Sequence, residues 1–404
     1  MTTAADPRLS ARVAALQPSA TLAMVQRVND LRAKGVAITD LTAGEPDFTP
    51  PKAAEEAGIQ AIREGKGRYT SAAGILELRE AAAIHLKNDF GLDFSADEIV
   101  VTHGAKIALA QALMAFGDPG RKVLVPYPCW TSYPEMVRLA EAEPVMVKTD
   151  SQHCPAVADL EAARDDQTVA LLLNTPGNPT GVVIPEQRLR EIAQWALEND
   201  VVIISDEIYG TLVYGDAKHF SPLALVPELK ETSIWVGGMS KAYAMTGWRM
   251  GLLAAAKPLA KKIAAIQSQL AGSPCAIAQH ASLAALTLGN EAREEMRLAF
   301  EKRSRLVFSA LQAMDGIECA KPQGAFYAFP NIKNFLGLTD PDSGRTVRTG
   351  DDLVEILLDQ DHVALIGGRA FGDEKSFRIS FATSEDVLQQ GLDKIAARLK
   401  KLQA

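Results

Sequence analysis

Short apolar runs that alternate with helix-length segments restrict the fold of this chain more than any other feature. Seven such runs lie between residues 98 and 254, and segments of helical or loop-like pattern separate them. Continuous apolar runs are typical of strands buried on both faces, and their alternation with helices is typical of a mostly parallel sheet covered by helices. The runs are Glu98–Val101, Lys122–Val125, Val145–Val147, Val169–Leu173, Val201–Ile204, Ile234–Val236 and Leu252–Ala254.

Ligands of such a sheet bind beyond the carboxyl ends of the strands, so the residues after each run are the first candidates for a site. After Val101, the segment 102–106 contains Gly104 and then opens a helix, which allows backbone N–H groups to converge on an anion. Taken alone, these residues are more often a plain tight turn than a phosphate site. After Leu173, the segment 174–181 offers the amide of Asn178 to a ligand, although many Asn-Pro pairs only mark a loop.

The apolar run that ends at Ile204 is followed by a carboxylate and a phenol. Asp206 and Tyr209 are three residues apart and would face the same way on a turn of helix. Asp206 could keep a pyridine nitrogen protonated, and Tyr209 could donate to a ring hydroxyl. A magnesium-binding Walker B strand is the rival interpretation, but it requires a GxxxxGK[ST] loop that the sequence lacks.

The segment Gly238–Gly251 places Lys241 eight residues before Arg249, directly after a strand-like run. Burial at the end of a strand favours the neutral amine of a lysine, which is a nucleophile that condenses with aldehydes. An arginine one short loop away can bind a phosphate dianion on the same molecule. Pyridoxal phosphate has both groups. A solvated lysine in a glycine-rich turn is the ordinary alternative, and the other three segments favour the cofactor.

The composition argues against several classes of protein. The 404 residues are 47% hydrophobic and 23% charged, which is ordinary for a globular protein with room for two domains. A formal net charge of -8 argues against nucleic acid or an anionic membrane as the partner. The four cysteines and six histidines show neither zinc-binding nor disulfide-framework spacing. Because no signal-peptide or membrane-spanning pattern occurs, we expect a cytoplasmic protein.

In the order of these motifs, the chain resembles the fold-type-I, class I aminotransferases, the aspartate aminotransferase family. It looks closest to the bacterial branch that includes aspartate and prephenate aminotransferases. The resemblance extends from Leu41–Phe48 through Tyr69–Gly74 to Phe377–Phe381. It implies pyridoxal phosphate as cofactor and an α/β fold, in which a large domain has a mixed, mainly parallel seven-stranded sheet covered by helices. A smaller α/β domain would complete the chain.

The expected domain boundaries follow the motifs. We expect the large, cofactor-binding domain to span residues 51–289. Residues 1–50, with an N-terminal arm, and residues 290–404 would form the small domain. The amphipathic pattern of Asn290–Met314 predicts a long helix that links the two domains.

The resemblance also implies a role for individual residues. Lys241 would bind the cofactor covalently and act as general base, with Asp206 and Tyr209 as the other catalytic residues. Asp206 would pair with the pyridinium nitrogen, while Asn178 and Tyr209 would contact the ring oxygen and Trp130 would stack on the ring. The phosphate would be bound by Gly104, Ala105, Lys106, Ser240 and Arg249, and by Tyr69 of a neighbouring subunit.

Substrate contacts and subunit assembly are implied in the same way. Arg378 would bind the substrate α-carboxylate as a bidentate fork, and the backbone of Gly44 would touch the same group. Trp130 and Asn178 would border the substrate as well. Because Tyr69 would serve the other subunit, we expect a homodimer with shared active sites.

The chain departs from the family pattern where specificity is decided. Gly238 replaces a phosphate-binding serine common in the family, so Ser240 or backbone groups would compensate. Leu270–Gly272 replaces Thr or Ser found in dicarboxylate-specific relatives. Lys106 matches a lysine that binds a distal carboxylate in that branch. Arg369 is unusual at its position, and either supplies the missing contact or blocks the pocket.

These residues predict an aminotransferase. It would move the α-amino group between an L-amino acid and a 2-oxo acid in a ping-pong cycle, with aspartate-like or broad specificity. A pyridoxal-phosphate-dependent lyase of the C–S type on the same fold is the main alternative. A non-catalytic, cofactor-binding regulator is a third, but the segment before Gly44 is short for a DNA-binding module with its linker.

Overall fold

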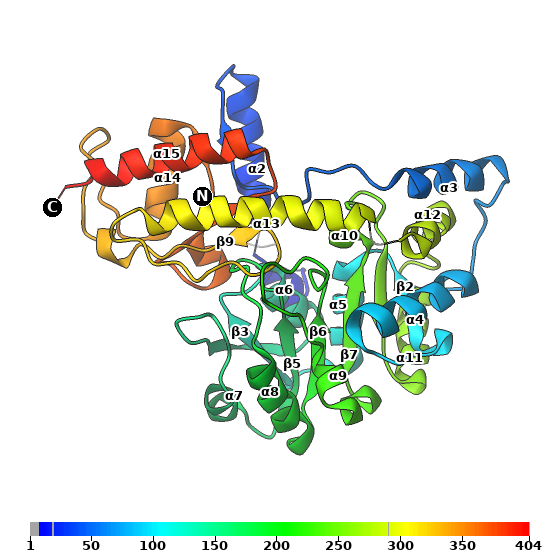
Figure 1. Cartoon of the computed structure of the whole chain (residues 1–404). Coiled ribbons are helices and arrows are strands. Elements are labelled where there is room, and N and C mark those ends of the chain that lie inside the picture. Colours follow the sequence, from blue (N-terminus) through cyan, green and yellow to red (C-terminus); the bar gives the residue numbers. More distant parts are fainter. Residues whose placement is uncertain (1–7, 18–19, 290, 404) are drawn as a thin grey trace.

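A seven-stranded sheet forms the centre of the larger part of the molecule (Figure 1). The computed structural model describes residues 8–17, 20–289 and 291–403. The strand order is β2-β8-β7-β6-β5-β3-β4, in which β8 runs antiparallel to both neighbours and the other pairs are parallel. Each predicted apolar run is one of these strands, and the predicted fold class is confirmed. The strands are β2 (Ile99–Thr102), β3 (Lys122–Tyr127), β4 (Glu143–Lys148), β5 (Thr168–Asn174), β6 (Val202–Asp206), β7 (Ile234–Gly238) and β8 (Gly251–Ala254).

Helices cover both faces of this sheet, and successive strand residues point to opposite faces. On one face, Val100 and Val125 pack with α5 (Ala105–Phe116), α6 (Ser132–Leu139) and α11 (Lys257–Leu270). On the other face, Val101 and Leu124 pack in a second core. Because both faces of the inner strands are buried, most of their positions favour an apolar residue, which explains the continuous runs. The helices of the second core are α3 (Lys52–Arg63), α4 (Leu76–Phe90), α7 (Val157–Ala163), α8 (Glu186–Glu198), α9 (Pro222–Leu225) and α12 (Ala276–Thr287).

Two small sheets form the rest of the molecule, which we call the small-sheet region. One is the parallel pair β1 (Thr39–Asp40) and β10 (Val363–Ala364), and the other has the order β11-β12-β9. They share an apolar core with α13 and the C-terminal helices. The remaining elements of this region are β9 (Tyr327–Ala328), β11 (Ile366–Gly367), β12 (Phe377–Ser380), α2 (Ala20–Ala33), α14 (Gly350–Asp361) and α15 (Glu385–Lys401).

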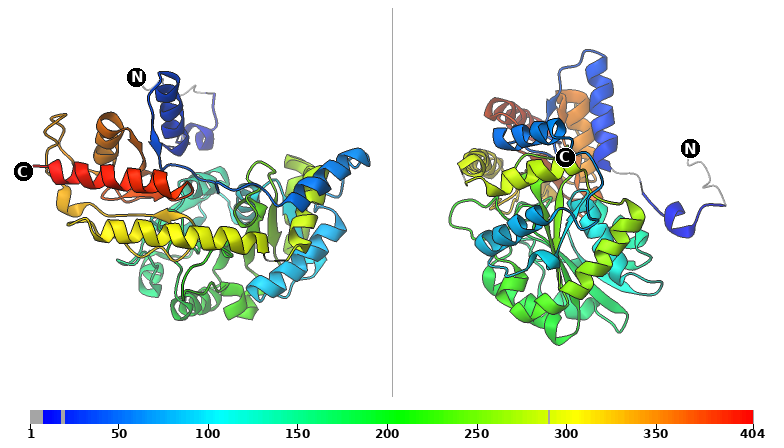
Figure 2. Two further views of the ribbon diagram at one scale, coloured as in Figure 1. Left: turned by 45° about the horizontal axis from the view of Figure 1, so that its top comes forward. Right: turned by 90° about the vertical axis from the view of Figure 1, so that its right-hand side faces the viewer.

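A single long helix, α13 (Glu291–Gln312), joins the two regions. Figures 1 and 2 show it extending from the small-sheet region across to the helices beside the large sheet. The predicted helix over Asn290–Met314 is thus present with slightly narrower bounds, and residue 290 lies outside the described residues. The predicted domain boundaries stay a prediction. The predicted N-terminal arm lies partly in residues 1–7 and 18–19, which are also outside the described residues.

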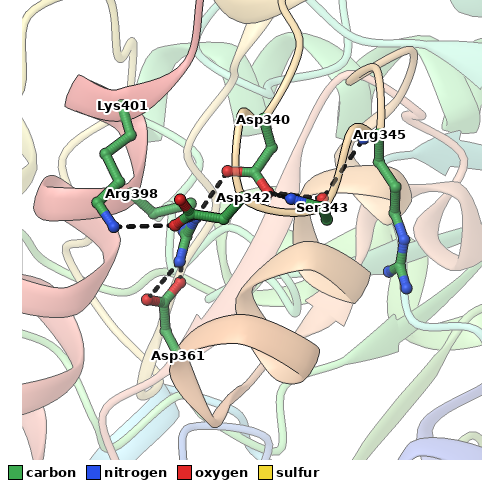
Figure 3. A network of polar contacts seen from close by, with 7 residues as sticks. All are labelled: Asp340, Asp342, Ser343, Arg345, Asp361, Arg398 and Lys401. Atoms are coloured by element: carbon green, nitrogen blue, oxygen red, sulfur yellow. Dashed lines mark hydrogen bonds and ion pairs between the residues drawn. The ribbon is translucent and has the colours of Figure 1, made fainter.

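The small-sheet region is held at one end by a buried arginine, Arg398 of α15 (Figure 3). Its guanidinium donates to Asp340 at 2.6 Å, to Asp342 at 2.7 Å and to both oxygens of Asp361 at 2.8 and 2.9 Å. Asp361 is the last residue of α14, so this network fixes α15 to the end of α14 and to the loop at 340–342. Over the part of the chain that the structure describes, no helix is long and apolar enough to cross a membrane.

Candidate active site

A cavity of about 320 Å³ lies where the large sheet meets the small-sheet region. Strands β5, β6 and β7 end beside it, and β12 reaches it from the other region. Both regions therefore build its wall. Most of the residues predicted for the site line it, namely Gly44, Ala105, Lys106, Trp130, Asn178, Asp206, Tyr209, Ser240, Lys241, Arg249 and Arg378.

Lys241 lies on the short helix α10 (Met239–Ala242), which follows β7 directly. At the end of β7, Gly238 packs closely against Gly251 of β8, and a Cβ atom on Gly238 would lie only 2.8 Å from the Cα atom of Gly251. The absence of a side chain at Gly238 therefore allows the close strand packing from which this helix starts. The amine of Lys241 donates to the carbonyl oxygen of Gly44. Burial lowers the pKa of Lys241 to about 8, against the attraction of the nearby carboxylate of Glu45. An amine with this pKa accepts and releases protons near neutral pH, as a general base must.

Asp206 is the last residue of β6 and is buried. The hydroxyl of Tyr133 donates to its Oδ2 at 2.7 Å, and the N–H of Ile208 donates to its Oδ1 at 3.2 Å. Burial raises the pKa of Asp206 to about 6, although both hydrogen bonds act to lower it. A carboxyl group with this pKa can share a proton with a weakly basic ring nitrogen.

Two asparagines fix the neighbouring wall of the cavity. The side chain of Asn174 donates to the backbone oxygen of Asp206 at 2.9 Å and accepts from the N–H of Asn178 at 2.9 Å. Asn178 in turn accepts from Arg378 at 3.1 Å. Opposite them, the hydroxyls of Tyr209 and Tyr327 lie 3.1 Å apart. Sequence analysis assigned no role to Asn174 or Tyr327, nor to Tyr133.

Arg378 is 2% exposed, on β12. Besides its bond to Asn178, it donates to the carbonyl oxygen of Thr42 at 2.9 Å, and its Nε is buried without a hydrogen-bond partner. Its guanidinium lies over the rings of Tyr327 and Phe371, 4.5 and 5.2 Å from their centres. Among the described residues, no carboxylate forms an ion pair with it, and burial lowers its pKa. Because a buried cation is costly without an anionic partner, this arginine is suited to an anionic ligand.

The opposite end of the cavity is suited to an anion as well. Helix α5 begins there, after Gly104, whose φ of 90° favours glycine. A Cβ atom on Gly104 would lie 2.5 Å from Nη2 of Arg249, so only glycine allows this arginine to approach the helix start. Arg249 also donates to the carbonyl oxygen of Thr246 at 2.8 Å. A helix N-terminus beside a guanidinium is a binding site for phosphate-like groups.

Trp130 and Lys106 form one side of the cavity. The amine of Lys106 lies 4.8 Å from the ring centre of Trp130, within the range of a cation–π contact. Burial, and to a lesser extent the charge of Arg249, lowers the pKa of Lys106. Lys106 is thus a second basic group, besides Arg249, on the cavity wall.

Two predicted residues lie away from the cavity. Tyr69 is 99% exposed on the loop before α4. Arg369 is exposed on the 3-10 helix Gly368–Phe371, and its backbone N–H donates to Asp351 at 3.2 Å. The segment 270–272 also lies outside the cavity, where Leu270 is 59% exposed. It leads to Ser273, whose hydroxyl accepts from the N–H of Thr70 at 3.2 Å, so this segment and Tyr69 are neighbours.

The chain belongs to the class I and II aminotransferases, whose family model matches residues 36–395. It is similar to the aspartate aminotransferase of Geobacillus stearothermophilus, with 39% identity over 96% of this chain and 98% of that one. It is 40% identical to a probable aspartate/prephenate aminotransferase of Rhizobium leguminosarum bv. phaseoli, over 94% of this chain and 96% of that one. The crystal structure of the aspartate aminotransferase from Rhizobium meliloti matches with a TM-score of 0.94 and 37% identity, over 98% of this chain and 100% of that one.

These similarities confirm the family and the class of enzyme that the motifs predicted. The chain is an aminotransferase that moves amino groups, and its family uses pyridoxal phosphate. The likeness to aspartate and prephenate aminotransferases confirms the predicted branch.

Proposed function

We propose that this aminotransferase binds pyridoxal phosphate in the cavity and exchanges amino groups between aspartate-like dicarboxylic amino acids and 2-oxo acids. One observation carries the proposal. Lys241 with a pKa of about 8, Asp206 with a pKa of about 6 and a buried Arg378, which has no carboxylate partner among the described residues, line the same cavity.

The residues of the cavity fit this cofactor. The start of α5 and Arg249 match a phosphate, and Gly104 keeps the space between them free of a Cβ atom. The carboxyl group of Asp206 is suited to share a proton with the ring nitrogen of the cofactor, and the amine of Lys241 is suited to react with its aldehyde. The residues that would hold the cofactor are Gly104, Ala105, Lys106, Trp130, Asn178, Asp206, Tyr209, Ser240, Lys241 and Arg249. When bound, pyridoxal phosphate supplies an electron-withdrawing ring that stabilises negative charge on the substrate α-carbon.

The protein's own groups would orient the substrate and move its protons. Arg378 would bind the α-carboxylate, with Nε and one terminal nitrogen as a fork. Lys241 would accept the α-proton at Nζ and return it, as its pKa near neutral pH allows. Asp206 would share a proton with the ring nitrogen, and the hydroxyl of Tyr133 would hold its carboxyl group in place. Tyr209 and Asn178 would orient the ring.

The dicarboxylic substrate class is supported by Lys106 and by the relatives. Lys106 adds a positive charge beside Trp130 on the cavity wall, where a second carboxylate would be attracted. The relatives named above are aspartate or aspartate/prephenate aminotransferases. Arg369, by contrast, lies outside the cavity of its own chain, so we assign it no substrate contact.

The test is kcat/KM for aspartate, glutamate, alanine and phenylalanine, with a 2-oxo acid as acceptor. We expect wild type to prefer the dicarboxylates. Lys106→Ala should lower kcat/KM for the dicarboxylates about tenfold more than for alanine, which corresponds to about 1–2 kcal/mol of transition-state stabilisation. Arg369→Ala is the matched control and should leave the preference unchanged. A wild type that prefers alanine or phenylalanine would refute the substrate class. Turnover without a 2-oxo acid would indicate a lyase.

We also propose a homodimer with shared sites. Tyr69 and the segment 270–273 form a neighbouring, exposed pair of loops. Arg249 also lines a second cavity of about 670 Å³, together with His103, Trp248 and Cys275. The hydroxyl of Tyr69 from a second copy would reach the phosphate there.

A mixing experiment separates a shared site from an independent one. Lys241→Ala and Tyr69→Ala each impair every site of their own homodimers. In a hybrid, the Tyr69→Ala subunit keeps its lysine and receives Tyr69 from its partner. Unfolding and refolding the two variants together should therefore restore activity that neither has alone. No restoration, in a mixture shown to contain hybrids, would contradict shared sites.

A further inference from the structure

The segment that joins β1 to α3 contacts three residues that line the cavity, namely Arg378, Lys241 and Thr246. The carbonyl oxygen of Thr42 accepts from Arg378 at 2.9 Å, and that of Gly44 accepts from Lys241. One residue later, Oε2 of Glu45 accepts from the hydroxyl of Thr246 at 2.6 Å. The first two contacts use the neutral backbone, so Glu45 is the point at which this segment brings a charge to the site.

Thr246 determines where that charge lies. It belongs to the loop at residues 243–250, which follows α10 and contains Arg249, and it lines the cavity. Its hydroxyl donates to Glu45, while its carbonyl oxygen accepts from Arg249 at 2.8 Å. The carboxylate of Glu45 is thereby fixed beside the loop that follows α10, the helix that carries Lys241.

Four charged groups act on the amine of Lys241, each from a different part of the fold. Arg249, on the same loop, and Arg378, on β12, repel the protonated amine. Asp206, on β6, attracts it, but more weakly than Glu45 does. Burial has the largest influence and lowers the pKa of Lys241, and the attraction of Glu45 is the largest influence that raises it.

We propose that Glu45, held by Thr246, is an electrostatic positioning residue that determines how readily the amine of Lys241 keeps the proton that amino-group transfer moves. Its importance for turnover rests on the proposed function. Its effect on the charge of Lys241 does not, because the carboxylate that Thr246 holds belongs to the residue directly after Gly44, whose carbonyl oxygen accepts from the amine of Lys241.

The experiment measures the charge of Lys241 without measuring turnover. Full-length protein freed of cofactor is labelled with trinitrobenzenesulfonate from pH 6 to 10, and the rate at Lys241 is followed by mass spectrometry of its peptide. Only the neutral amine reacts. Glu45→Gln keeps an acceptor for Thr246 but removes the charge. The pH at which labelling of Lys241 is half-maximal, which we call the midpoint, should therefore fall, and labelling at pH 7 should be about threefold faster. Because Glu45 is exposed, high salt should reduce this difference.

Three further variants separate charge from loss of structure. Asp47→Asn removes the same charge two residues away, where the carboxylate binds Arg303 at 2.6 and 2.9 Å, and should leave the midpoint unchanged. Thr246→Val should lower the midpoint by releasing the carboxylate, and Thr246→Ser should restore it. A wild-type midpoint in Glu45→Gln, or an equal shift in Asp47→Asn, would overturn the proposal. Failure of the proposed function would appear separately, as an absence of transamination in wild type.

Discussion

Two buried arginines of the small-sheet region, Arg378 and Arg398, have opposite surroundings. They are 2% and 3% exposed. Arg398 donates to three carboxylates, chiefly to Asp361, and these contacts raise its pKa (Figure 3). Within the described part of the chain, Arg378 has only neutral acceptors and a buried Nε without a partner, and burial lowers its pKa. Removing a buried cation whose anions belong to the protein leaves those anions unpaired and destabilises the fold, whereas a buried cation that lacks such anions is suited to bind an anion from outside.

The largest expected effect is on catalysis, from Arg378→Ala. A buried substrate carboxylate would lose its partner, which costs about 3–5 kcal/mol and lowers kcat/KM for every amino acid by at least about a hundredfold. The free energy of unfolding should change little or increase, because an unpaired buried charge is removed. Steady-state kinetics and urea unfolding of the same preparation measure both quantities. Full activity in this variant would end the distinction between the two arginines.

Arg398→Ala should show the reverse pattern. Asp340 would be left buried without its cation, so the free energy of unfolding should fall by about 3 kcal/mol, while kcat/KM of the folded protein stays near that of wild type. Arg345→Ala is the control, because Arg345 pairs with Asp359 at the surface, where an ion pair contributes about 1 kcal/mol or less. Equal losses in the free energy of unfolding for both variants would show that the buried network contributes no more to stability than a surface ion pair does.

The two regions should also differ in how stability depends on pH. The pKa of Asp206 is about 6 in the folded chain and about 3.9 in an unfolded one, so the folded state binds the extra proton between these values. Stability from this group is complete below pH 4 and is lost as the pH rises to 6. Asp340 has a lowered pKa, so its contribution is lost instead as the pH falls below 4.

Asp206→Asn tests the first of these signs. In cofactor-free protein, the variant should gain about 2 kcal/mol of stability relative to wild type between pH 4 and pH 6. Urea unfolding at intervals of half a pH unit measures the difference. A constant difference across this range would mean that Asp206 titrates alike in both states.

The sequence predicts the sheet well because the relevant property is local. The inner strands are buried on both faces, so their residues are apolar with little interruption, as in Val169–Leu173, whereas the edge strand β4 is partly exposed. Lys241 and Asp206 could be placed together because both follow such strands, whose carboxyl ends meet at one edge. Arg378 comes from a different sheet, and its role was predicted only by resemblance to a family.

Apart from the bond between Asn174 and Asn178, which are four residues apart, the contacts that sequence analysis missed are tertiary. Tyr133 lies 73 residues before Asp206, and Tyr327 lies 118 residues after Tyr209, so no local pattern links them. The buried position of Arg398 could not be predicted for the same reason. This arginine stands near the C-terminus of an amphipathic helix with Lys400 and Lys401, where basic residues are ordinarily solvated, and only the fold shows that it is buried. Arg369, by contrast, was a candidate for a substrate contact in the sequence but lies outside the cavity.

The central claim is that the cavity shared by Arg378 and Lys241 holds the cofactor on that lysine. Purified protein loaded with pyridoxal phosphate and treated with borohydride tests it directly, by mass spectrometry of the peptides. The account predicts one pyridoxyl group per chain, on Lys241, and none in Lys241→Ala. A label on any other lysine, or an equal label in the variant, would contradict it.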